Sequence, residues 1–246
     1  MKAFEFFSAK RQQFAQRAQA AFAQYKEAKK QRGMTLLEVI IVLGIIGTIA
    51  AGVVVLAQRA FDSRTVSEVV QATNTIRVAM KDAYSSSGSY PAYSSDVLSL
   101  DNNTIVSGTS TAPISTLVKL GKVSVSEARN KISGDFYAIA GGLTAKGQTP
   151  PKGFAIEVNG LTSEQCRSIL TQVGNNWDYV QVSNSGPGSY SASLNAGVEL
   201  TAEKAADDAA VGVLRSLTSA VSISPARIVA TCTDSGANNS IIFGSR

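Results

Sequence analysis

The chain has 246 residues, 44% of them hydrophobic, with 23 Lys and Arg against 18 Asp and Glu and no histidine. A formal charge of +5 suggests a polyanion-binding protein, but residues 1–33 alone carry eight Lys or Arg against two Glu. The remainder carries 15 basic and 16 acidic residues, a formal charge of −1. This nearly neutral body, without RNP-type or zinc-finger patterns, argues against a nucleic-acid partner.

No motif in the sequence indicates an enzyme. Histidine, the commonest acid–base catalyst, is missing, and the chain has no GxSxG motif, no P-loop and no EF-hand-like acidic set. Asp207 and Asp208 are expected on a solvated helix face rather than at a metal. We therefore expect no catalytic residues, no cofactor and no metal ion.

An apolar run follows the basic segment directly. Val39 to Ala57 contains 19 uncharged residues, which as a helix would extend roughly 28 Å, close to the thickness of a bilayer core. The run is therefore able to span a membrane. The Lys and Arg before it predict a cytoplasmic N-terminus and a body on the other side of the membrane.

Two simple interpretations of this region leave features unexplained. A secretory signal peptide normally has a shorter apolar run, although a cut after Ala50 is conceivable because Ala50, Ala51 and Gly52 are small. A plain single-pass anchor gives no role to Glu38, whose carboxylate costs on the order of 2–3 kcal/mol at bilayer depth. The alternative for Glu38 is that its side chain merely reaches the membrane interface.

Residues 33–39 read Gly-Met-Thr-Leu-Leu-Glu-Val, and with the apolar run they resemble the type IV prepilin signature, G|(F or M)-T-L-x-E. The resemblance implies cleavage between Gly33 and Met34 by an inner-membrane prepilin peptidase, which also N-methylates Met34 and leaves the apolar helix in place. Met34 and the leader of 33 residues point to the type IVb branch. Further segments are similar to the major pilins of toxin-coregulated and longus-type pili of enteric pathogens: 57–62, 74–79, 89–92 and 160–166, with the downstream Cys232.

This resemblance implies the major subunit of a type IVb pilus, a helical homo-oligomer used for adhesion, colonisation and self-association. Glu38 would neutralise the amine of Met34 in a neighbouring subunit. The implied partners are the peptidase, the pilus assembly machinery, a minor pilin at the tip and a host-cell surface. The head would lie in the periplasm before assembly and outside the cell afterwards. A minor pilin, a secretion pseudopilin and a monomeric membrane-anchored binding protein are the alternatives.

The predicted fold is α+β, with a long N-terminal helix, its apolar half protruding, packed on an antiparallel sheet. The helix is expected over residues 35–86, with an apolar stripe on one face from Val66 to Ala83. Gly44, Gly47 and Gly52 allow close helix packing or local unwinding in a filament. The predicted parts are the leader 1–33, as a membrane-surface helix or an unstructured peptide, the apolar half 34–57, the amphipathic half 58–87, and the head 88–246 with its loop region 88–150.

Short elements are predicted within the head. Strands are expected over 136–140, 153–158, 177–182, 227–231 and 240–243, and helical pieces over 114–120, 124–127, 162–173 and 201–217. Residues 183–189 are expected to form an exposed loop. Cys166 and Cys232 lie in the translocated part, where an oxidising compartment would let them pair and bound the region 166–232. The alternative is two buried free thiols.

Overall fold

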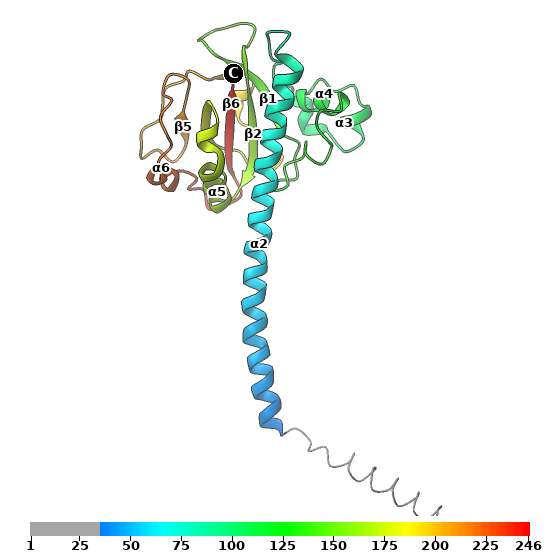
Figure 1. Cartoon of the computed structure of the whole chain (residues 1–246), viewed down its shortest axis with the longest axis vertical. Helices are drawn as coiled ribbons and strands as arrows, with labels where there is room; N and C mark the ends of the chain where they lie inside the picture. Colours follow the sequence, from blue (N-terminus) through cyan, green and yellow to red (C-terminus); the bar gives the residue numbers. More distant parts are fainter. Residues whose placement is uncertain (1–34) are drawn as a thin grey trace, which may run out of the picture. The chain divides into compact units, whose positions relative to one another are not determined.

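The computed structural model describes residues 35–246 and divides the chain into two units, Met1–Gln58 and Arg59–Arg246 (Figure 1). The predictions for the leader and for Gly33 and Met34 therefore lie outside the described residues. Helix α2 (Leu36–Tyr84) has 49 residues. It supplies the described part of the first unit and begins the second. The predicted helix over 35–86 is thus confirmed to within two residues at each end.

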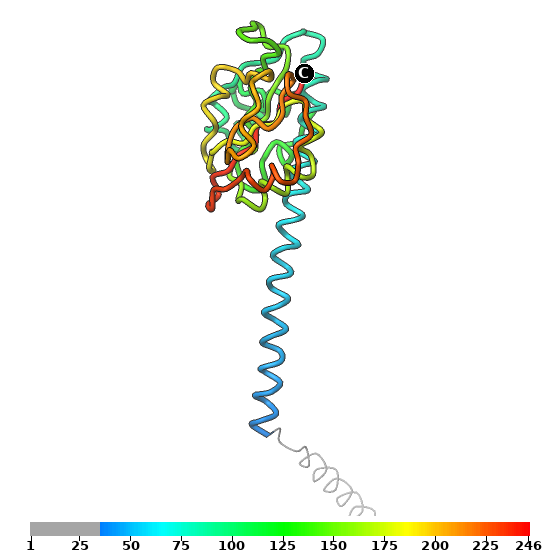
Figure 2. Tube along the Cα trace, turned by 90° about the vertical axis from the view of Figure 1, so that its left-hand side faces the viewer, coloured from blue at the N-terminus to red at the C-terminus, as the bar shows by residue number. Residues whose placement is uncertain are grey.

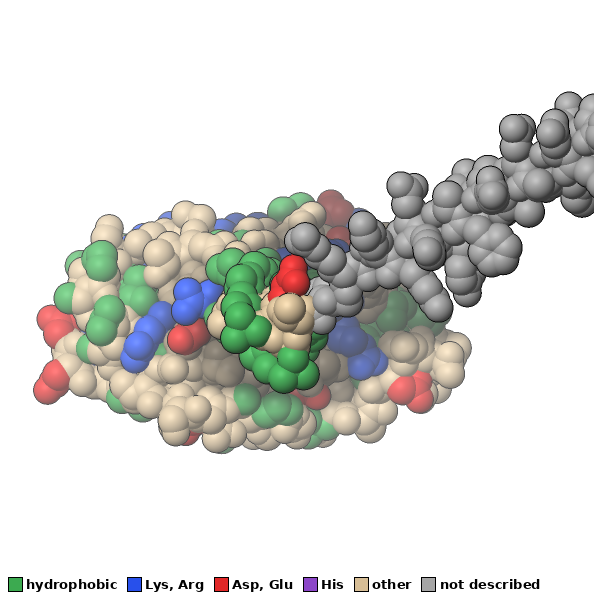
Figure 3. All heavy atoms as spheres, turned by 90° about the horizontal axis from the view of Figure 1, so that it is seen from below, with side chains coloured by type: hydrophobic (Ala, Val, Ile, Leu, Met, Phe, Trp, Pro, Cys, Tyr) green, Lys and Arg blue, Asp and Glu red, His purple; other side chains and the backbone are tan. Residues whose placement is uncertain are grey.

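In the first unit, α2 is apolar on most sides. Seen from below, green apolar side chains cover most of the circumference of the helix, and an acidic side chain, in red, lies on one side (Figure 3). The large apolar residues from Leu36 to Leu56 are exposed, and no proline interrupts them. The three glycines in this stretch lie within continuous helix.

In the second unit, α2 is amphipathic. It buries Val66, Val69, Thr73, Ile76 and Met80 at spacings of three and four residues, which places them on one face of the helix. This confirms the predicted apolar stripe. The helix ends at Tyr84 before a turn in which Gly88 adopts φ +63, a left-handed conformation that glycine adopts without strain.

A six-stranded sheet forms the centre of the head, in the order β4-β1-β2-β6-β3-β5. The strands are β1 (Ala138–Leu143), β2 (Gly153–Leu161), β3 (Tyr179–Asn184), β4 (Val198–Glu199), β5 (Gly212–Arg215) and β6 (Asn239–Ser245). All pairings are antiparallel except that of the short edge strand β4, which runs parallel to β1. The α+β fold class is confirmed, with a mixed rather than purely antiparallel sheet.

Short helices flank this sheet. They are η1 (Ser95–Ser99), α3 (Thr104–Ser107), α4 (Pro113–Lys119), α5 (Ser163–Val173), η2 (Gly174–Asn176), η3 (Ala192–Leu194) and α6 (Pro225–Ala230). In the second unit α3 and α4 lie on one side of α2, and α5, β5 and α6 on the other (Figures 1 and 2). The predicted helices over 114–120 and 162–173 are confirmed, and so are strands close to four of the five predicted ranges.

Two predicted elements have the wrong type. Residues 227–231 lie in α6 and its C-cap rather than in a strand, because Ser224 caps the helix by accepting a bond from Arg227 N (3.2 Å) and Pro225 occupies its first position. Residues 201–217 form turns and β5 rather than a helix. Gly212 there adopts φ +121, which a helix does not allow. Asp207 and Asp208 are exposed, but on a turn.

The predicted capping box at 124–127 closes a turn rather than opening a helix. Ser124 Oγ accepts a bond from Glu127 N (3.2 Å), and Glu127 Oε2 accepts one from Ser124 N (3.1 Å). The Glu127 carboxylate also accepts a bond from Ser124 Oγ (2.6 Å), and this bond and the one from Ser124 N lower the pKa of Glu127, since they stabilise its charged form. The local interaction was predicted correctly, but the chain does not continue as a helix after it.

Candidate functional site

The N-terminal end of α2 is organised by Thr35. Its hydroxyl accepts a hydrogen bond from Glu38 N (3.2 Å), and its carbonyl accepts one from Val39 N (3.1 Å). Thr35 is therefore the N-cap. The helix begins at the next residue, which places Glu38 in the first turn with its side chain exposed. A carboxylate is stabilised there by the positive end of the helix dipole.

The predicted processing and assembly residues are only partly described. Gly33 and Met34 lie outside residues 35–246, so their cleavage and methylation stay predictions. Glu38 lies in the described part, exposed at the start of α2, and its pairing with Met34 of another copy also stays a prediction. The role of Thr35 as the cap was not predicted. The sequence did contain a signal for it, because Thr-x-x-Glu has the spacing of a capping box.

The apolar half of α2 presents a long uncovered surface. Its most apolar window has a mean hydropathy of 2.9 and none of it is buried. By length and composition α2 is able to cross a membrane. A side chain added at Gly44, Gly47 or Gly52 would meet nothing within 4 Å. Exposed apolar surface of this extent requires lipid or other protein to cover it.

The two cysteines form a disulfide between two helical segments of the head. Cys166 lies in α5, and Cys232 follows α6. The Cα atoms of the two cysteines are 5.9 Å apart. The bond excludes the alternative of two free thiols. The sequence predicted Cys232 at the end of a strand, and this is wrong. Cys232 lies just after helix α6 and adopts φ +58. Arg167 of α5 reinforces the junction by donating from Nε to the carbonyl of Thr231 (3.3 Å).

The outer face of α2 in the second unit carries few charges. Four uncharged residues with exposed side chains recur along this face at spacings of three and four residues: Ser67, Gln71, Asn74 and Val78. Val78 is 68% exposed. They line a shallow groove of about 880 Å³, which ends near Asp82 and Lys122. A solvated helix face usually carries several charges. This face is therefore suited to contact with another protein surface.

Within residues 35–246, no group of three or more His, Cys, Asp or Glu side chains is arranged to hold a metal ion. The head contains instead two buried charged residues that the sequence analysis did not single out, Glu157 and Arg227. Arg227 donates from Nη1 to the carbonyls of Asp207 (2.8 Å) and Ala209 (2.6 Å). It therefore holds the turn between β4 and β5 against α6.

Comparisons with known proteins agree with this arrangement. The family model of the toxin-coregulated pilus subunit TcpA matches residues 116–241, and that of the prokaryotic N-terminal methylation motif matches residues 28–54. A toxin coregulated pilin of Vibrio cholerae serotype O1 is 42% identical over 152 residues, 62% of this chain and 62% of that pilin. A second Vibrio cholerae toxin coregulated pilin is 42% identical over 63% of this chain and 64% of its own length. The aligned part thus spans less than two thirds of these relatives.

A solved structure supports the same relationship. The crystal structure of TcpA, a type IV pilin from the El Tor biotype of Vibrio cholerae, superposes on this chain with a TM-score of 0.58 at 25% identity. The superposition covers 74% of this chain and 99% of that one.

Proposed function

The chain belongs to the family of toxin-coregulated pilus subunits, and on this premise we propose that it is the major structural subunit of a type IVb pilus. The exposed apolar half of α2 carries the proposal, because it requires either a bilayer or other subunits around it. Copies of the chain would pass from the first environment to the second as the filament grows. The filament would serve adhesion, colonisation and bacterial self-association, and the chain would have no catalytic role.

The proposed maturation begins in the inner membrane. Prepilin peptidase cuts between Gly33 and Met34 and methylates the new amine, which leaves α2 in the bilayer and the head in the periplasm. The match to the N-terminal methylation motif over residues 28–54 supports this step. The assembly machinery then extracts the subunit into an extracellular filament. A minor pilin at the tip and a host-cell surface are the remaining proposed partners.

We assign the assembly contact to Glu38 and Met34. Cleavage creates an α-amine four residues before Glu38, and the two opposite charges attract strongly where little water surrounds them. Because Thr35 caps the helix, Glu38 is held in the first turn. Its exposed carboxylate is therefore accessible to the amine of a neighbouring copy, and this pairing would set the axial register of the subunits.

The outer face of α2 in the head supports assembly through side-by-side packing. The exposed residues Ser67, Gln71, Asn74 and Val78 bring no charge into such a contact, so burying them carries no cost of desolvating an ion. A second copy is a fitting occupant of the groove that they line. The charged pair Asp82 and Lys122 at its end would mark the rim.

Electron microscopy of cells expressing the chain with its assembly genes tests the proposal. Wild type is expected to form long filaments that contain this chain. Glu38→Ala should lower filament yield at least tenfold while the cleaved protein accumulates normally in the membrane, because one unpaired amine per subunit would be buried. Glu203→Ala, which removes an exposed head carboxylate, is the matched control and should assemble as wild type.

Two results would contradict the proposal. Filaments formed without this chain in their shaft would assign it a minor or non-structural role. Normal filament yield from a processed, stable Glu38→Ala variant would reject the assembly contact while leaving the subunit role intact.

A further inference from the structure

The two faces of the sheet are covered by different structures. On one face, Phe243 of β6 stacks on Trp177, over which lies Arg77 of α2. The other face is covered by residues 185–200, which follow β3, include the short edge strand β4 and are called the strap. Leu200 packs so closely there that a Cβ added to Gly153 of β2 would lie 2.8 Å from its Cδ1.

Glu157 of β2 points toward the strap. Side chains alternate along a strand, so Glu157 shares the face of Gly153. Its carboxylate Oε2 accepts a hydrogen bond from the backbone N of Ser191 in the strap (2.8 Å). Leu194 and Leu200, both fully buried, are the apolar anchors of the same segment. Glu157 is thus the carboxylate over which the strap closes.

Two further side chains hold the first part of the strap. Asn159 Nδ2 donates to the carbonyls of Gly186 (3.1 Å) and Ser189 (2.9 Å), and Asp135 Oδ2 accepts from Gly188 N (2.7 Å). Between these anchors residues 187–189 are exposed, as predicted, whereas Ser183 and Asn184 of the predicted loop belong to β3 and Ser185 is buried. Few buried apolar contacts fix this stretch, so its closure depends on the polar bonds beneath it.

The surroundings of Glu157 disfavour a negative charge. Its side chain is 0% exposed, and its second oxygen, Oε1, has no hydrogen-bond partner among the described residues. Burial raises the pKa of Glu157, and the hydrogen bond from Ser191 N and the hydroxyls of Ser240 and Ser185 oppose this only in part. In residues 35–246 no Lys or Arg forms an ion pair with it. The groups facing it from the strap and the packed segments are Tyr93, Ser185, Tyr190 and Ser240.

The two tyrosines do not supply a compensating charge. Burial raises the pKa of Tyr93 and of Tyr190, and the negative charge of Glu157 raises both further. The neighbouring Asp135 adds to the shift at Tyr190. Both phenols are therefore neutral at physiological pH and bring no charge that could compensate the negative charge of Glu157.

We propose that the strap is a proton-linked latch, which closes over the sheet with the uptake of one proton by Glu157 and releases that proton to solvent when it opens. Opening exposes the carboxyl to water, where it titrates as an ordinary glutamic acid. In the closed state the proton is bound more tightly. Closure is therefore fully favoured below the ordinary glutamate pKa and weakens as the pH rises through the higher, closed-state pKa.

Hydrogen exchange measured by mass spectrometry on the unassembled full chain in detergent micelles tests this latch. Protection factors, corrected for the intrinsic pH dependence of exchange, are compared between pH 5 and pH 8 for the peptide that contains Ser191. We expect protection to fall as the pH rises, by about tenfold per pH unit at most, because one proton is linked to opening. Protection of β2 and β6 should change less.

Three variants separate the latch from a general loss of structure. Glu157→Gln keeps the shape without the charge, so strap protection should be high and independent of pH. Tyr190→Phe removes the hydroxyl that donates to Phe136 O, and should lower protection at every pH without changing its slope. Glu164→Gln, on the exposed start of α5, should match wild type.

The latch is rejected if wild-type protection does not change with pH, or if Glu157→Gln keeps the wild-type slope. The measurement concerns the unassembled chain and does not depend on the proposed function. A negative exchange result would therefore not affect the proposed pilus function. Conversely, a failure to form filaments would not affect the latch, which the exchange data test independently.

Discussion

Arg77 is a single residue that joins α2 to the end of the sheet. Its guanidinium lies 4.6 Å from the ring centre of Trp177, and its Nη1 donates to the carbonyl of Asn176 (2.8 Å). Its Nε donates to Ser245 Oγ at 3.2 Å, and Asp178 lies 3.8 Å from Nη2. Because several donors act from one planar group, lysine cannot replace it.

We expect Arg77→Ala to lower the free energy of unfolding by about 2 kcal/mol, from the lost cation–π contact and the lost hydrogen bonds of a charged group. Arg77→Lys should recover less than half of this. Arg64→Ala is the matched control on the same helix. Its side chain is 76% exposed and, within the part of the chain that the structure describes, pairs with Glu68 alone, so the loss should be below about 0.5 kcal/mol. Urea unfolding of the full chain in detergent measures all three, and equal losses for Arg77 and Arg64 would contradict the assignment.

Buried polar residues were the hardest single positions to predict. The sequence around Glu157 alternates with apolar residues as in any strand with one solvated face. A glutamate there is normally read as facing water. It is buried because the strap, distant in sequence, covers that face of the sheet. No local pattern contains this information.

At the level of elements, the disulfide links α5 to the residue after α6. It encloses β3, the strap with β4 at its end, and β5, while β6 lies outside the loop and inserts between β2 and β3. The last strand of the chain therefore joins a strand that precedes the disulfide loop to one that lies within it. The bond restricts a sequence separation of 66 residues in the unfolded chain.

We expect Cys166→Ser with Cys232→Ser to cost roughly 4 kcal/mol of unfolding free energy on the chain-entropy model. Denaturant unfolding with and without a reductant measures it. Reduction of wild type should produce a similar loss, and reduction of the double variant should produce no further change. A loss on reducing the double variant would show that the effect does not come from this bond.

The elements that sequence predicted best were those whose signal is local and repeated. Thr162 caps α5 and completes a capping box with Gln165, and the helix was predicted to within one residue. Residues 201–217 show the opposite case. Alanine and valine at spacings of three and four indicated a helix, but pairing of β5 with β3 prevailed over that weak preference.

At the scale of the whole molecule, processing would change both charge and location. Removal of residues 1–33 takes away six net positive charges and leaves a mature chain of formal charge −1.

Mass spectrometry of the protein purified from expressing cells should find N-methyl-Met34 as the first residue. Gly33→Glu places a bulky charge at the cut site and should leave the leader in place, without filaments. A mature terminus at Ala51, or an intact Met1 in wild-type filaments, would refute the maturation scheme.

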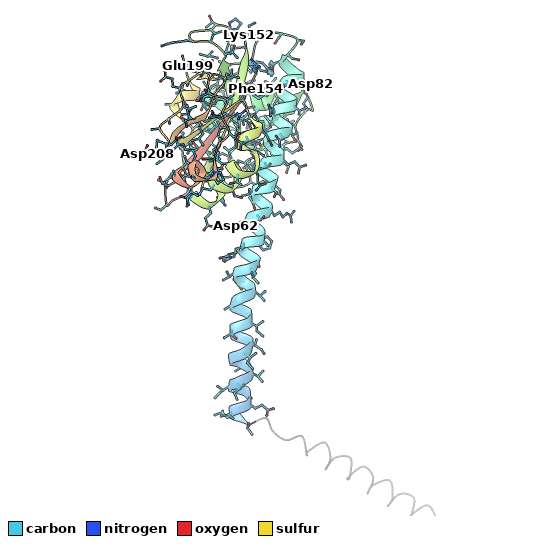
Figure 4. All side chains as sticks on the ribbon, turned by 60° about the vertical axis from the view of Figure 1, so that its left-hand side comes forward. Asp62, Asp82, Lys152, Phe154, Glu199 and Asp208 are labelled. Atoms are coloured by element: carbon cyan, nitrogen blue, oxygen red, sulfur yellow. A yellow bond between two sulfur atoms is a disulfide. The ribbon has the colours of Figure 1, made fainter. Side chains whose placement is uncertain are left out.

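The sequence by itself determined the long helix, its change from apolar to amphipathic, the α+β class and the family. These properties are written in contiguous residues, because helix periodicity, apolar length and a cleavage signature need no distant partner. Only the tertiary structure decided the parallel pairing of β4, the helical state of residues 225–230, and the burial of Glu157 and Arg227. Each of these depends on which segments far apart in the chain come to lie against one another. Figure 4 labels three residues of such segments in the head, Asp82 of α2, Phe154 of β2 and Glu199 of β4.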